Sequence, residues 1–245
     1  MRQSATTETE LLILGDSISL GVSELRGNVV AQRVAPSYVD RLRQWLPTFT
    51  ITVDAELHRT TAQALARLPN LLAAHRPDVV LVMLGGNDAD LEWKRFVVSD
   101  GRVARARVPL EQYAANLRAI VRTVLDAGAI PILTDMPNHD LPRRGAYTSA
   151  LCGKDISSLL EKGGGQAVTD ASLQTYRRAA RDVADETGSV LVNYGEQLGR
   201  HDRHAMCGPD GGHPSAAAHE YIAQALLPAL QNIREQIPVS VGLAS

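Results

Sequence analysis

The chain has 245 residues, of which 44% are hydrophobic and 21% are charged, and its formal net charge is −2. These values are ordinary for a globular protein, and a chain of this length can bury a substantial core. The near-neutral balance gives no indication of a nucleic-acid partner or an acidic membrane partner.

Neither a transmembrane span nor a signal peptide is visible in the sequence. No apolar run reaches the length that crosses a bilayer, and residues 1–10 are polar and lack an apolar h-region. We therefore expect a cytoplasmic protein, with secretion as the alternative if a signal peptide has been removed. Composition predicts nothing about the oligomeric state.

The first apolar run, residues 11–14, is wholly aliphatic and ends at Gly15-Asp16-Ser17. Such a run predicts a strand that is buried on both faces, as in a parallel sheet covered by helices. Ser17 then lies just past the C-terminal edge of that strand, where open α/β sheets bind ligands. The following segment, residues 18–34, is expected to be a loop or a broken helix.

The rest of the chain alternates between strand-like and helix-like patterns. Strands are predicted at residues 49–53, 78–84, 129–134 and 190–193. Helices are predicted at residues 36–46, 109–127, 169–185 and 214–230, and in a stretch from residue 60 onward that is kinked or restarted at Pro69. This alternation favours parallel βαβ units, and we expect one domain over residues 1–245 with helices on both sides of a five-stranded sheet.

Two segments interrupt the alternation. Residues 95–107 are expected to form a small hairpin insertion, because Asp100-Gly101 suits a tight turn. Residues 136–169 are rich in proline and glycine and are expected to form a long loop near the site, with a short helix at residues 156–160.

Candidate catalytic groups follow the first three predicted strands and precede the last helix. They are Ser17, then residues 58–61, then Gly85 to Asp88, and finally Asp210-Gly211-Gly212-His213-Pro214. A serine needs a base to remove its proton as it attacks, and His213 is a candidate for that role. Asp210 would hold the imidazole ring in one tautomer. The Ser17 backbone N–H and the Asn87 amide would stabilise an oxyanion.

These blocks resemble the SGNH hydrolases, also called GDSL esterases and lipases. The resemblance rests on Gly15-Asp16-Ser17, Gly85-x-Asn87-Asp88 and Asp210-x-x-His213-Pro214, in that order, and it spans nearly the whole chain. It implies a three-layer, flavodoxin-like α/β fold with a five-stranded parallel sheet of order 2-1-3-4-5. It also implies Ser17 as the nucleophile, Asp210 and His213 as its relay, and no metal or organic cofactor.

His58 is the one departure from the family pattern. The family carries a glycine in its second block, and its backbone N–H completes the oxyanion hole; alignment on Thr60-Thr61 places His58 there. Backbone donation does not require glycine, so His58 is expected to be part of the hole. Its imidazole would narrow the pocket, contact substrate or donate a ring N–H.

Other polar and aromatic residues have a structural and a functional interpretation. Asp16 and Asp88 are expected to orient loops through hydrogen bonds. His201 and His204 are assigned to a solvated loop in preference to a metal site, because no third ligand cluster lies nearby. Cys152 and Cys207 are expected to be free thiols, with one disulfide as the alternative. Several side chains are left between a pocket and a surface role: Arg102, Arg105, Arg107, Arg143, Arg144, Trp93, Phe96, His139 and Tyr147.

The sequence therefore predicts a serine esterase that cleaves small-molecule, glycan or lipid carboxylic esters through an acyl-enzyme. A short acyl group is expected, because residues 108–117 resemble the corresponding helix in family members that hydrolyse acetate esters. Residues 61–69 instead resemble the lysophospholipase and thioesterase members, which keeps that activity open. Acyl transfer to an alcohol is another alternative, and a catalytically weak ligand-binding relative is the alternative outside enzymes.

Overall fold

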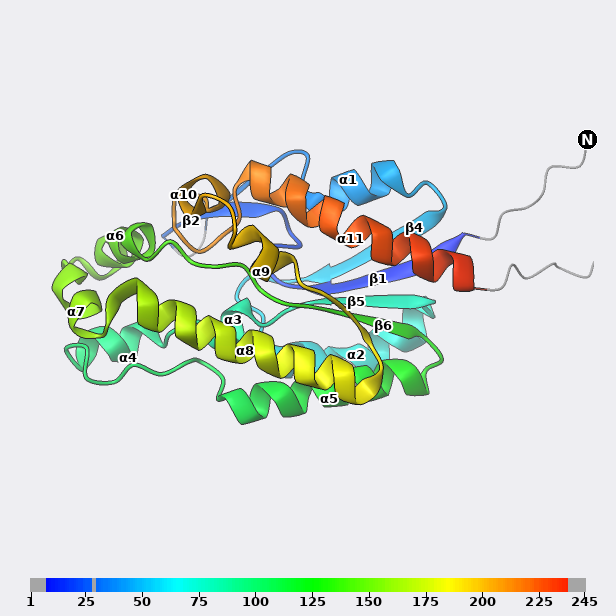
Figure 1. The fold of residues 1–245 in the computed structure, drawn as a ribbon, viewed down its shortest axis with the longest axis horizontal. Helices are drawn as coiled ribbons and strands as arrows, with labels where there is room; N and C mark the ends of the chain where they lie inside the picture. The colour runs from blue at the N-terminus through cyan, green and yellow to red at the C-terminus, as the bar shows by residue number, and fades with distance from the viewer. Residues whose placement is uncertain (1–7, 28–29, 238–245) are drawn as a thin grey trace, which may run out of the picture.

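A parallel five-stranded sheet forms the centre of the computed structural model, which describes residues 8–27 and 30–237 (Figure 1). The strand order is β4-β1-β5-β6-β7, and each neighbouring pair is parallel. The strands are β1 (Thr9–Gly15), β4 (Phe49–Ala55), β5 (Val79–Met83), β6 (Ile130–Thr134) and β7 (Val190–Val192). Counted along the chain this is order 2-1-3-4-5, so the predicted fold class is confirmed. Residues 1–7, on which the expectation of no signal peptide rests, lie outside the described residues.

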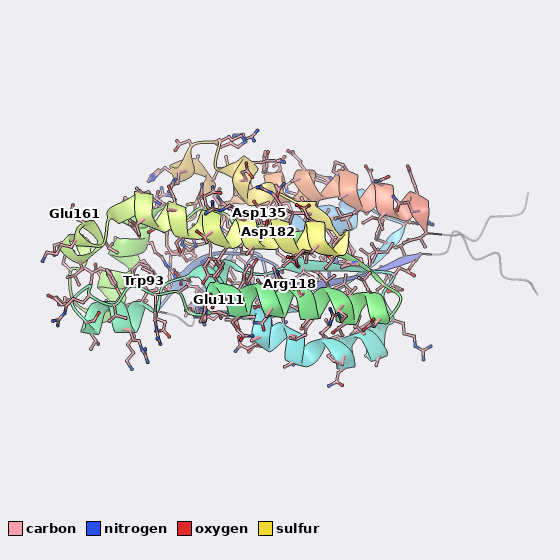
Figure 2. The ribbon with its side chains drawn as sticks, turned by 60° about the horizontal axis from the view of Figure 1, so that its bottom comes forward. Trp93, Glu111, Arg118, Asp135, Glu161 and Asp182 are labelled. Carbon is pink, nitrogen blue, oxygen red and sulfur yellow. The ribbon has the colours of Figure 1, made fainter. Side chains whose placement is uncertain are left out.

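Helices cover both faces of the sheet because successive residues of a strand point to opposite sides. In β1, Leu12 and Leu14 belong to one buried cluster, whereas Leu11 and Ile13 belong to another. The first cluster is closed by α2 (Thr61–His75), α5 (Leu110–Asp126) and α8 (Gly165–Thr187), which lie on one face (Figures 1 and 2). The second is closed by α1 (Tyr38–Trp45), α9 (Tyr194–Leu198) and α11 (Ala216–Gln236). Pro69 lies inside α2, which continues through it without a restart.

The C-terminal ends of β1, β4 and β5 bring the candidate catalytic segments to one edge of the sheet. After β5 the chain turns at Gly85 into the short helix α3 (Gly86–Ala89). Gly85 has a φ of 121°, and a Cβ at this position would lie 2.9 Å from the Tyr113 hydroxyl and from the Met136 side chain. Glycine is therefore required for the turn that presents Asn87 at this edge.

The segment that follows Ser17 forms two short strands, so the prediction of a loop or broken helix for residues 18–34 is wrong. β2 (Val22–Arg26) pairs with β3 (Val30–Arg33) in antiparallel orientation. Val22 and Leu25 are buried, which gives β2 a partly apolar face that the flanking polar residues obscure in the sequence. Residues 28 and 29, between the strands, lie outside the described part of the chain.

The predicted hairpin over residues 95–107 is also wrong. The chain instead forms the helix α4 (Trp93–Val98). Asp100 and Gly101 have left-handed backbone geometry and do form a turn, but this turn follows α4 and does not connect two strands. Phe96 is buried against Ile156 and Leu159, and this contact favours helical spacing. Among the described residues, the antiparallel pairing that involves residues 95–107 is a single isolated bridge between Ala106 and Leu91.

Residues 136–169, predicted as a long loop with one short helix at residues 156–160, contain more helix than expected. The helices are α6 (Leu141–Cys152), α7 (Ser157–Lys162), which lies where the short helix was predicted, and the start of α8 at Gly165. Asp140 caps α6, and Pro142 lies in its first turn, where a missing N–H costs no intrahelical hydrogen bond. This proline therefore begins a helix and does not break one. The short helix α10 (Arg203–Met206) precedes the His213 loop. Across the described residues, no helix is both long enough and apolar enough to span a bilayer.

Candidate active site

Ser17 and His213 meet at the C-terminal edge of the sheet, although 196 positions separate them in the chain. The Oγ of Ser17 lies 2.9 Å from Nε2 of His213, which is hydrogen-bond distance. Ser17 follows β1, whereas His213 lies just before α11. Both side chains are largely buried, so the contact is shielded from bulk water.

Asp210 completes a chain of hydrogen bonds that starts at Ser17. Its Oδ2 lies 2.6 Å from Nδ1 of His213 and also accepts the backbone N–H of Leu25 at 2.9 Å. Its Oδ1 accepts the backbone N–H groups of Gly212 and His213. Burial alone would raise the pKa of Asp210, but the bond to His213 and the backbone donors hold that pKa well below its usual value. Asp210 is therefore ionised at neutral pH and accepts a hydrogen bond from Nδ1 of the ring.

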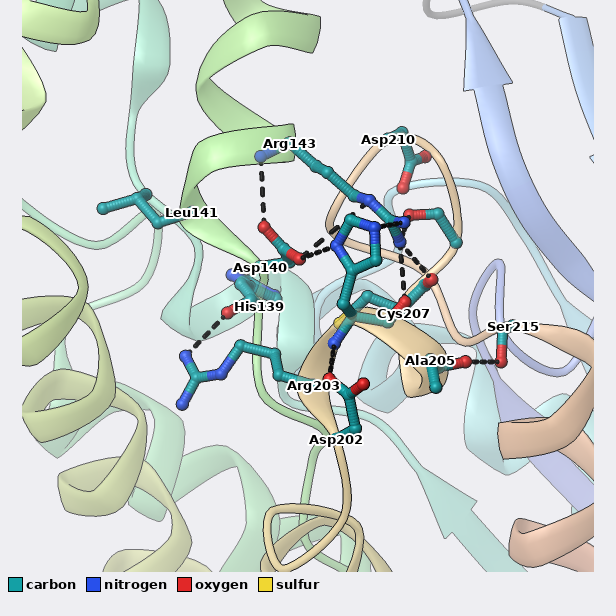
Figure 3. Close-up of polar contacts among 12 residues, drawn as sticks. His139, Asp140, Leu141, Arg143, Asp202, Arg203, Ala205, Cys207, Asp210 and Ser215 are labelled. Carbon is teal, nitrogen blue, oxygen red and sulfur yellow. Dashed lines mark hydrogen bonds and ion pairs between the residues drawn. The ribbon is translucent and has the colours of Figure 1, made fainter.

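The loop that carries Asp210 and His213 is held by the start of α6 (Figure 3). The backbone N–H of Asp140 donates to the carbonyl of Gly211 at 2.9 Å. Arg143 donates from Nη1 to the carbonyls of His204 and Cys207, each at 2.8 Å. Residues 207–213 therefore depend for their position on a helix in a segment whose composition predicts a loop.

Asn87 lies on α3 with its amide between two charged groups. Its Nδ2 donates to Oδ2 of Asp16 at 3.0 Å, and its Oδ1 accepts from Nη1 of Arg107 at 3.2 Å. Asp16 also accepts the backbone N–H of Ile18 at 2.9 Å. Burial raises the pKa of Asp16 to about 6, although the Ile18 and Asn87 bonds act in the opposite direction. Asp16 thus orients its neighbours through hydrogen bonds.

His58, at the predicted oxyanion position, has left-handed backbone geometry. Its φ is 62°, which glycine adopts readily and other residues rarely do. Glycine would adopt this conformation without strain, so the expectation that other residue types are disfavoured here has a physical basis. The carbonyl of His58 accepts a hydrogen bond from Nη2 of Arg107 at 3.3 Å.

A buried polar network connects the second and third sequence blocks beneath the pocket. The hydroxyl of Thr61 donates to Asp88 at 2.5 Å, and the backbone N–H of Thr61 also donates to that carboxylate. Asn116 of α5 donates from Nδ2 to the Thr61 hydroxyl at 2.9 Å. Burial raises the pKa of Asp88, against the bonds from Thr61. Asp88 therefore joins α2, α3 and α5 and does not face the pocket.

Four candidate residues, Ser17, His58, Asn87 and His213, line one cavity of about 60 Å³, whereas Asp210 is outside its lining and contacts it through His213. The lining also includes several residues that the sequence left undecided or did not single out. The lining residues beyond the predicted set include Leu25, Asp90, Pro137, His139, Arg144 and Tyr147. An open groove of about 1060 Å³ shares His58, Asp90, Arg144 and Tyr147 with this cavity. The predicted residues thus lie at the narrow end of a wide groove.

Asp90 is a charged pocket residue that the sequence did not single out. The one feature of the sequence that could have indicated a pocket role for Asp90 is its position, three residues after Asn87. Its Oδ2 accepts from Nη2 of Arg144 at 2.8 Å, and its Oδ1 accepts from Nε1 of Trp93 at 2.9 Å. The Arg144 guanidinium is 5.7 Å from the centroid of the Trp93 ring and 5.5 Å from that of Tyr147. The Nε of Arg144 is buried and has no hydrogen-bond partner among the residues that the structure describes.

The remaining candidates separate into pocket and structural residues. His139 lines the pocket, and burial lowers its pKa to about 4, so it is neutral at pH 7. Phe96 lies in a small buried cluster. Arg105 pairs with Glu92, and Arg102 donates to the carbonyl of Ser99.

Neither the His201–His204 segment nor the cysteines forms a metal site in the described residues. His204 contacts Asp140, and the ring of His201 packs edge-on against that of Tyr221. No group of three or more His, Cys, Asp or Glu side chains that could hold a metal occurs in residues 8–27 and 30–237. Cys152 is exposed, Cys207 is buried, and both are free.

Comparison with known proteins decides the family. The model of the GDSL-like lipase/acylhydrolase family matches residues 13–221. The chain belongs to this family. The matched region contains Ser17, Asn87, Asp210 and His213, and three of these, Ser17, Asn87 and His213, line the cavity described above.

Curated relatives carry several ester-hydrolase names. An arylesterase of Vibrio mimicus is 39% identical over 134 residues, which are 53% of this chain and 57% of the relative. Thioesterase 1/protease 1/lysophospholipase L1 of Escherichia coli strain K12 is 34% identical over 131 residues, 54% of this chain and 52% of the relative. The chain therefore matches little more than half the length of these relatives.

Solved structures share the fold over nearly the whole chain. A lipase/acylhydrolase from Enterococcus faecalis has a TM-score of 0.66 at 16% identity, with 95% of this chain and 98% of that chain covered. A catalytic mutant of an acetylxylan esterase from Geobacillus stearothermophilus has a TM-score of 0.60 at 23% identity, with coverages of 90% and 93%. At these identities the similarity shows the fold.

Proposed function

We propose that this protein is a serine hydrolase of carboxylic esters with Ser17 as its nucleophile. The observation that carries the proposal is the unbroken hydrogen-bond chain from Ser17 through His213 to Asp210 at the wall of a cavity. A serine that contacts a histidine whose other nitrogen binds a carboxylate is the arrangement that acyl transfer requires. Family membership and the names of the relatives support the same reaction class.

The proposed reaction passes through an acyl-enzyme. Ser17 Oγ attacks the ester carbonyl carbon while Nε2 of His213 takes the hydroxyl proton. Asp210 stabilises the resulting imidazolium through Nδ1. As the tetrahedral intermediate collapses, the bond to the alcohol oxygen breaks and His213 returns the proton to that oxygen. Water then attacks the Ser17 ester by the same route and releases the acid.

The developing oxyanion is proposed to bind donors from the three strand ends. They are the backbone N–H groups of Ser17 and His58 and the Asn87 amide. Nδ2 of Asn87 has two hydrogens, and its bond to Asp16 uses one of them. The second hydrogen is then the one that binds substrate. Removal of one such donor typically costs about 100- to 1000-fold in rate.

The size of the cavity supports a short acyl group. Its volume is about 60 Å³, room for about four water-sized groups, which is close to the size of an acetyl unit. The groove of about 1060 Å³ that opens from it would hold the alcohol portion. We therefore propose acetyl or similarly short esters of a larger alcohol as substrates.

A second cavity favours the longer-chain alternative. It has a volume of about 120 Å³, has Leu91, Phe96 and Leu173 in its wall, and shares Asp90 and His139 with the catalytic cavity. This apolar space would accommodate a longer acyl chain, as the thioesterase or lysophospholipase alternative requires; one relative carries that name. A series of p-nitrophenyl esters from acetate to decanoate separates the two: a maximum at two to four carbons supports the short-acyl proposal, and a maximum at eight or more contradicts it.

Labelling with a fluorophosphonate tests the nucleophile. We expect one label per chain in the unaltered protein, none in Ser17→Ala, and full labelling in the control Ser23→Ala, whose hydroxyl is on β2. Ester hydrolysis should follow the same pattern. Failure of the unaltered protein to take the label would instead support the weak ligand-binding alternative. Product analysis with an added alcohol distinguishes hydrolysis from acyl transfer.

A further inference from the structure

The guanidinium group of Arg107 contacts two of the residues proposed to form the oxyanion hole, Asn87 and His58. Nη1 donates to Oδ1 of Asn87 at 3.2 Å, and Nη2 donates to the carbonyl of His58 at 3.3 Å. The backbone N–H of Arg107 donates to the carbonyl of Asp90 at 2.9 Å, which fixes the start of its side chain. We propose that Arg107 is a positioning residue that holds the Asn87 amide and the His58 backbone in the orientations that oxyanion binding requires. The inference rests on the proposed function and deepens it.

The amide of Asn87 has one favourable orientation because of Arg107 and Asp16. Its nitrogen faces the Asp16 carboxylate and its oxygen faces the guanidinium. A rotation by 180° would place the amide oxygen against a carboxylate and the amide NH₂ against a cation, so both contacts would become repulsive. Arg107 therefore keeps the nitrogen on the pocket side before substrate binds, and preorganised donors of this kind lower the barrier for acyl transfer.

His58 needs external support because of its backbone conformation. A left-handed residue other than glycine is strained, and such a conformation persists only where surrounding contacts hold it. The bond from Nη2 of Arg107 ends on the carbonyl of His58 and thereby fixes the peptide that follows it. A lysine has no planar fork and donates as a single compact group, so it cannot reproduce both bonds in one geometry.

The charge of Arg107 lies one amide group away from the proposed oxyanion position, because the guanidinium binds Oδ1 of Asn87 and the proposed donor is Nδ2 of the same amide. Its side-chain hydrogen bonds end on neutral oxygens, and within the part of the chain that the structure describes no carboxylate lies within ion-pair distance of it. Arg105, two residues earlier, differs because it pairs with Glu92. A cation without a directly paired carboxylate stabilises a nearby oxyanion more strongly than one that is neutralised.

The test compares kcat and KM for p-nitrophenyl acetate in Arg107→Met, Arg107→Lys and Arg107→Gln. We expect kcat to fall about 30- to 300-fold in Arg107→Met with KM changed less than about threefold, because the lost interaction acts in the transition state. Arg107→Lys should recover part of the loss through its charge. The control is Arg102→Met, which removes an exposed cation of the same segment and should leave kcat unchanged.

A double-mutant cycle with Asn87→Ala separates positioning from a general structural role. If Arg107 acts through Asn87, Arg107→Met should cost less than about fivefold in kcat once Asn87 is alanine, because the two losses overlap. Fully additive losses, or unchanged kcat in all three Arg107 variants that fold, would overturn the inference. Should Arg107→Met fail to fold, Arg107→Gln and Arg107→Lys decide. Ser17→Ala activity equal to the unaltered protein would instead overturn the proposed function itself.

Discussion

Arg144 donates from Nη2 to Oδ2 of Asp90 at 2.8 Å, and both residues line the catalytic cavity as well as the open groove. The two side chains are 13% and 11% exposed, so this ion pair is largely withdrawn from water. Burial alone would raise the pKa of Asp90, but the charge of Arg144 holds that pKa below its usual value. The pair therefore stays ionised at neutral pH and fixes the shape of the cavity entrance.

Removal of one partner of this pair should be strongly destabilising. In Arg144→Met the Asp90 carboxylate stays buried without its counter-charge, and we expect the free energy of unfolding to fall by about 3–5 kcal/mol. The double variant Arg144→Met/Asp90→Asn removes that charge and should recover most of the loss, because the introduced amide oxygen can still accept from Trp93. Urea unfolding of the variants measures this, and additive losses would contradict it.

Asp16 should make the protein less stable as the pH rises. Its pKa is about 6 in the folded chain and 3.8 as the ordinary value, so the folded state retains a proton that the unfolded state releases. The contribution of Asp16 to stability is therefore complete below about pH 4 and is lost as the pH rises to about 6, a difference of about 3 kcal/mol. Urea unfolding should be measured for the unaltered protein and for Asp16→Asn from about pH 4 to about pH 8. The difference between their free energies of unfolding should change between about pH 4 and about pH 6. If this difference in the free energy of unfolding were the same at every pH, the raised pKa of Asp16 would be contradicted.

His58 offers a test of backbone strain apart from side-chain function. His58→Gly and His58→Ala both delete the imidazole, but only alanine keeps the penalty of a φ of 62°. We expect the glycine variant to be more stable than the alanine variant by about 1 kcal/mol, measured by thermal and urea unfolding. A difference in ester hydrolysis between these variants and the unaltered protein then reports on the imidazole. Equal stability of the two variants would show that the turn relaxes.

The Thr61 hydroxyl should contribute more to stability than a typical threonine. Thr61→Val has nearly the same shape but leaves the buried Asp88 without the 2.5 Å donor and Asn116 without its acceptor. We expect the free energy of unfolding to fall by about 2 kcal/mol. Thr175→Val, on an exposed part of α8, should change it by less than about 0.5 kcal/mol. Equal effects of both substitutions would show that the Asp88 network does not stabilise the fold.

The centre of the sheet could be predicted from the sequence because β1 and β5 contain uninterrupted apolar runs that no helix pattern competes with. The run at residues 11–14 and the one at 79–83 become β1 and β5, side by side, and the polar residues after each lie at one edge. The placement of Ser17 and Asn87 in one cavity follows from strand direction alone.

The helices around the site could not be predicted in the same way. Asp100-Gly101 has the turn chemistry of a hairpin, but a turn of this kind also follows a helix, and the burial of Phe96 decides between them. Gly145 is a residue type that is common in loops, but here it lies in α6. A Cβ at this position would lie 2.5 Å from the Leu160 side chain, so glycine allows α6 and α7 to pack closely. Asp90 and Arg144 are 54 positions apart, and no local pattern links them.

The wide chain separation between Ser17 and His213 has a consequence during synthesis. A ribosome that adds about 5–20 residues per second needs about 10–40 s to make the 196 positions between them. Throughout that interval the emerging chain contains the serine without its histidine. Under the proposed mechanism, ester cleavage can therefore begin only after translation has passed residue 213, and the first turnover would report that β1 and the loop before α11 have assembled.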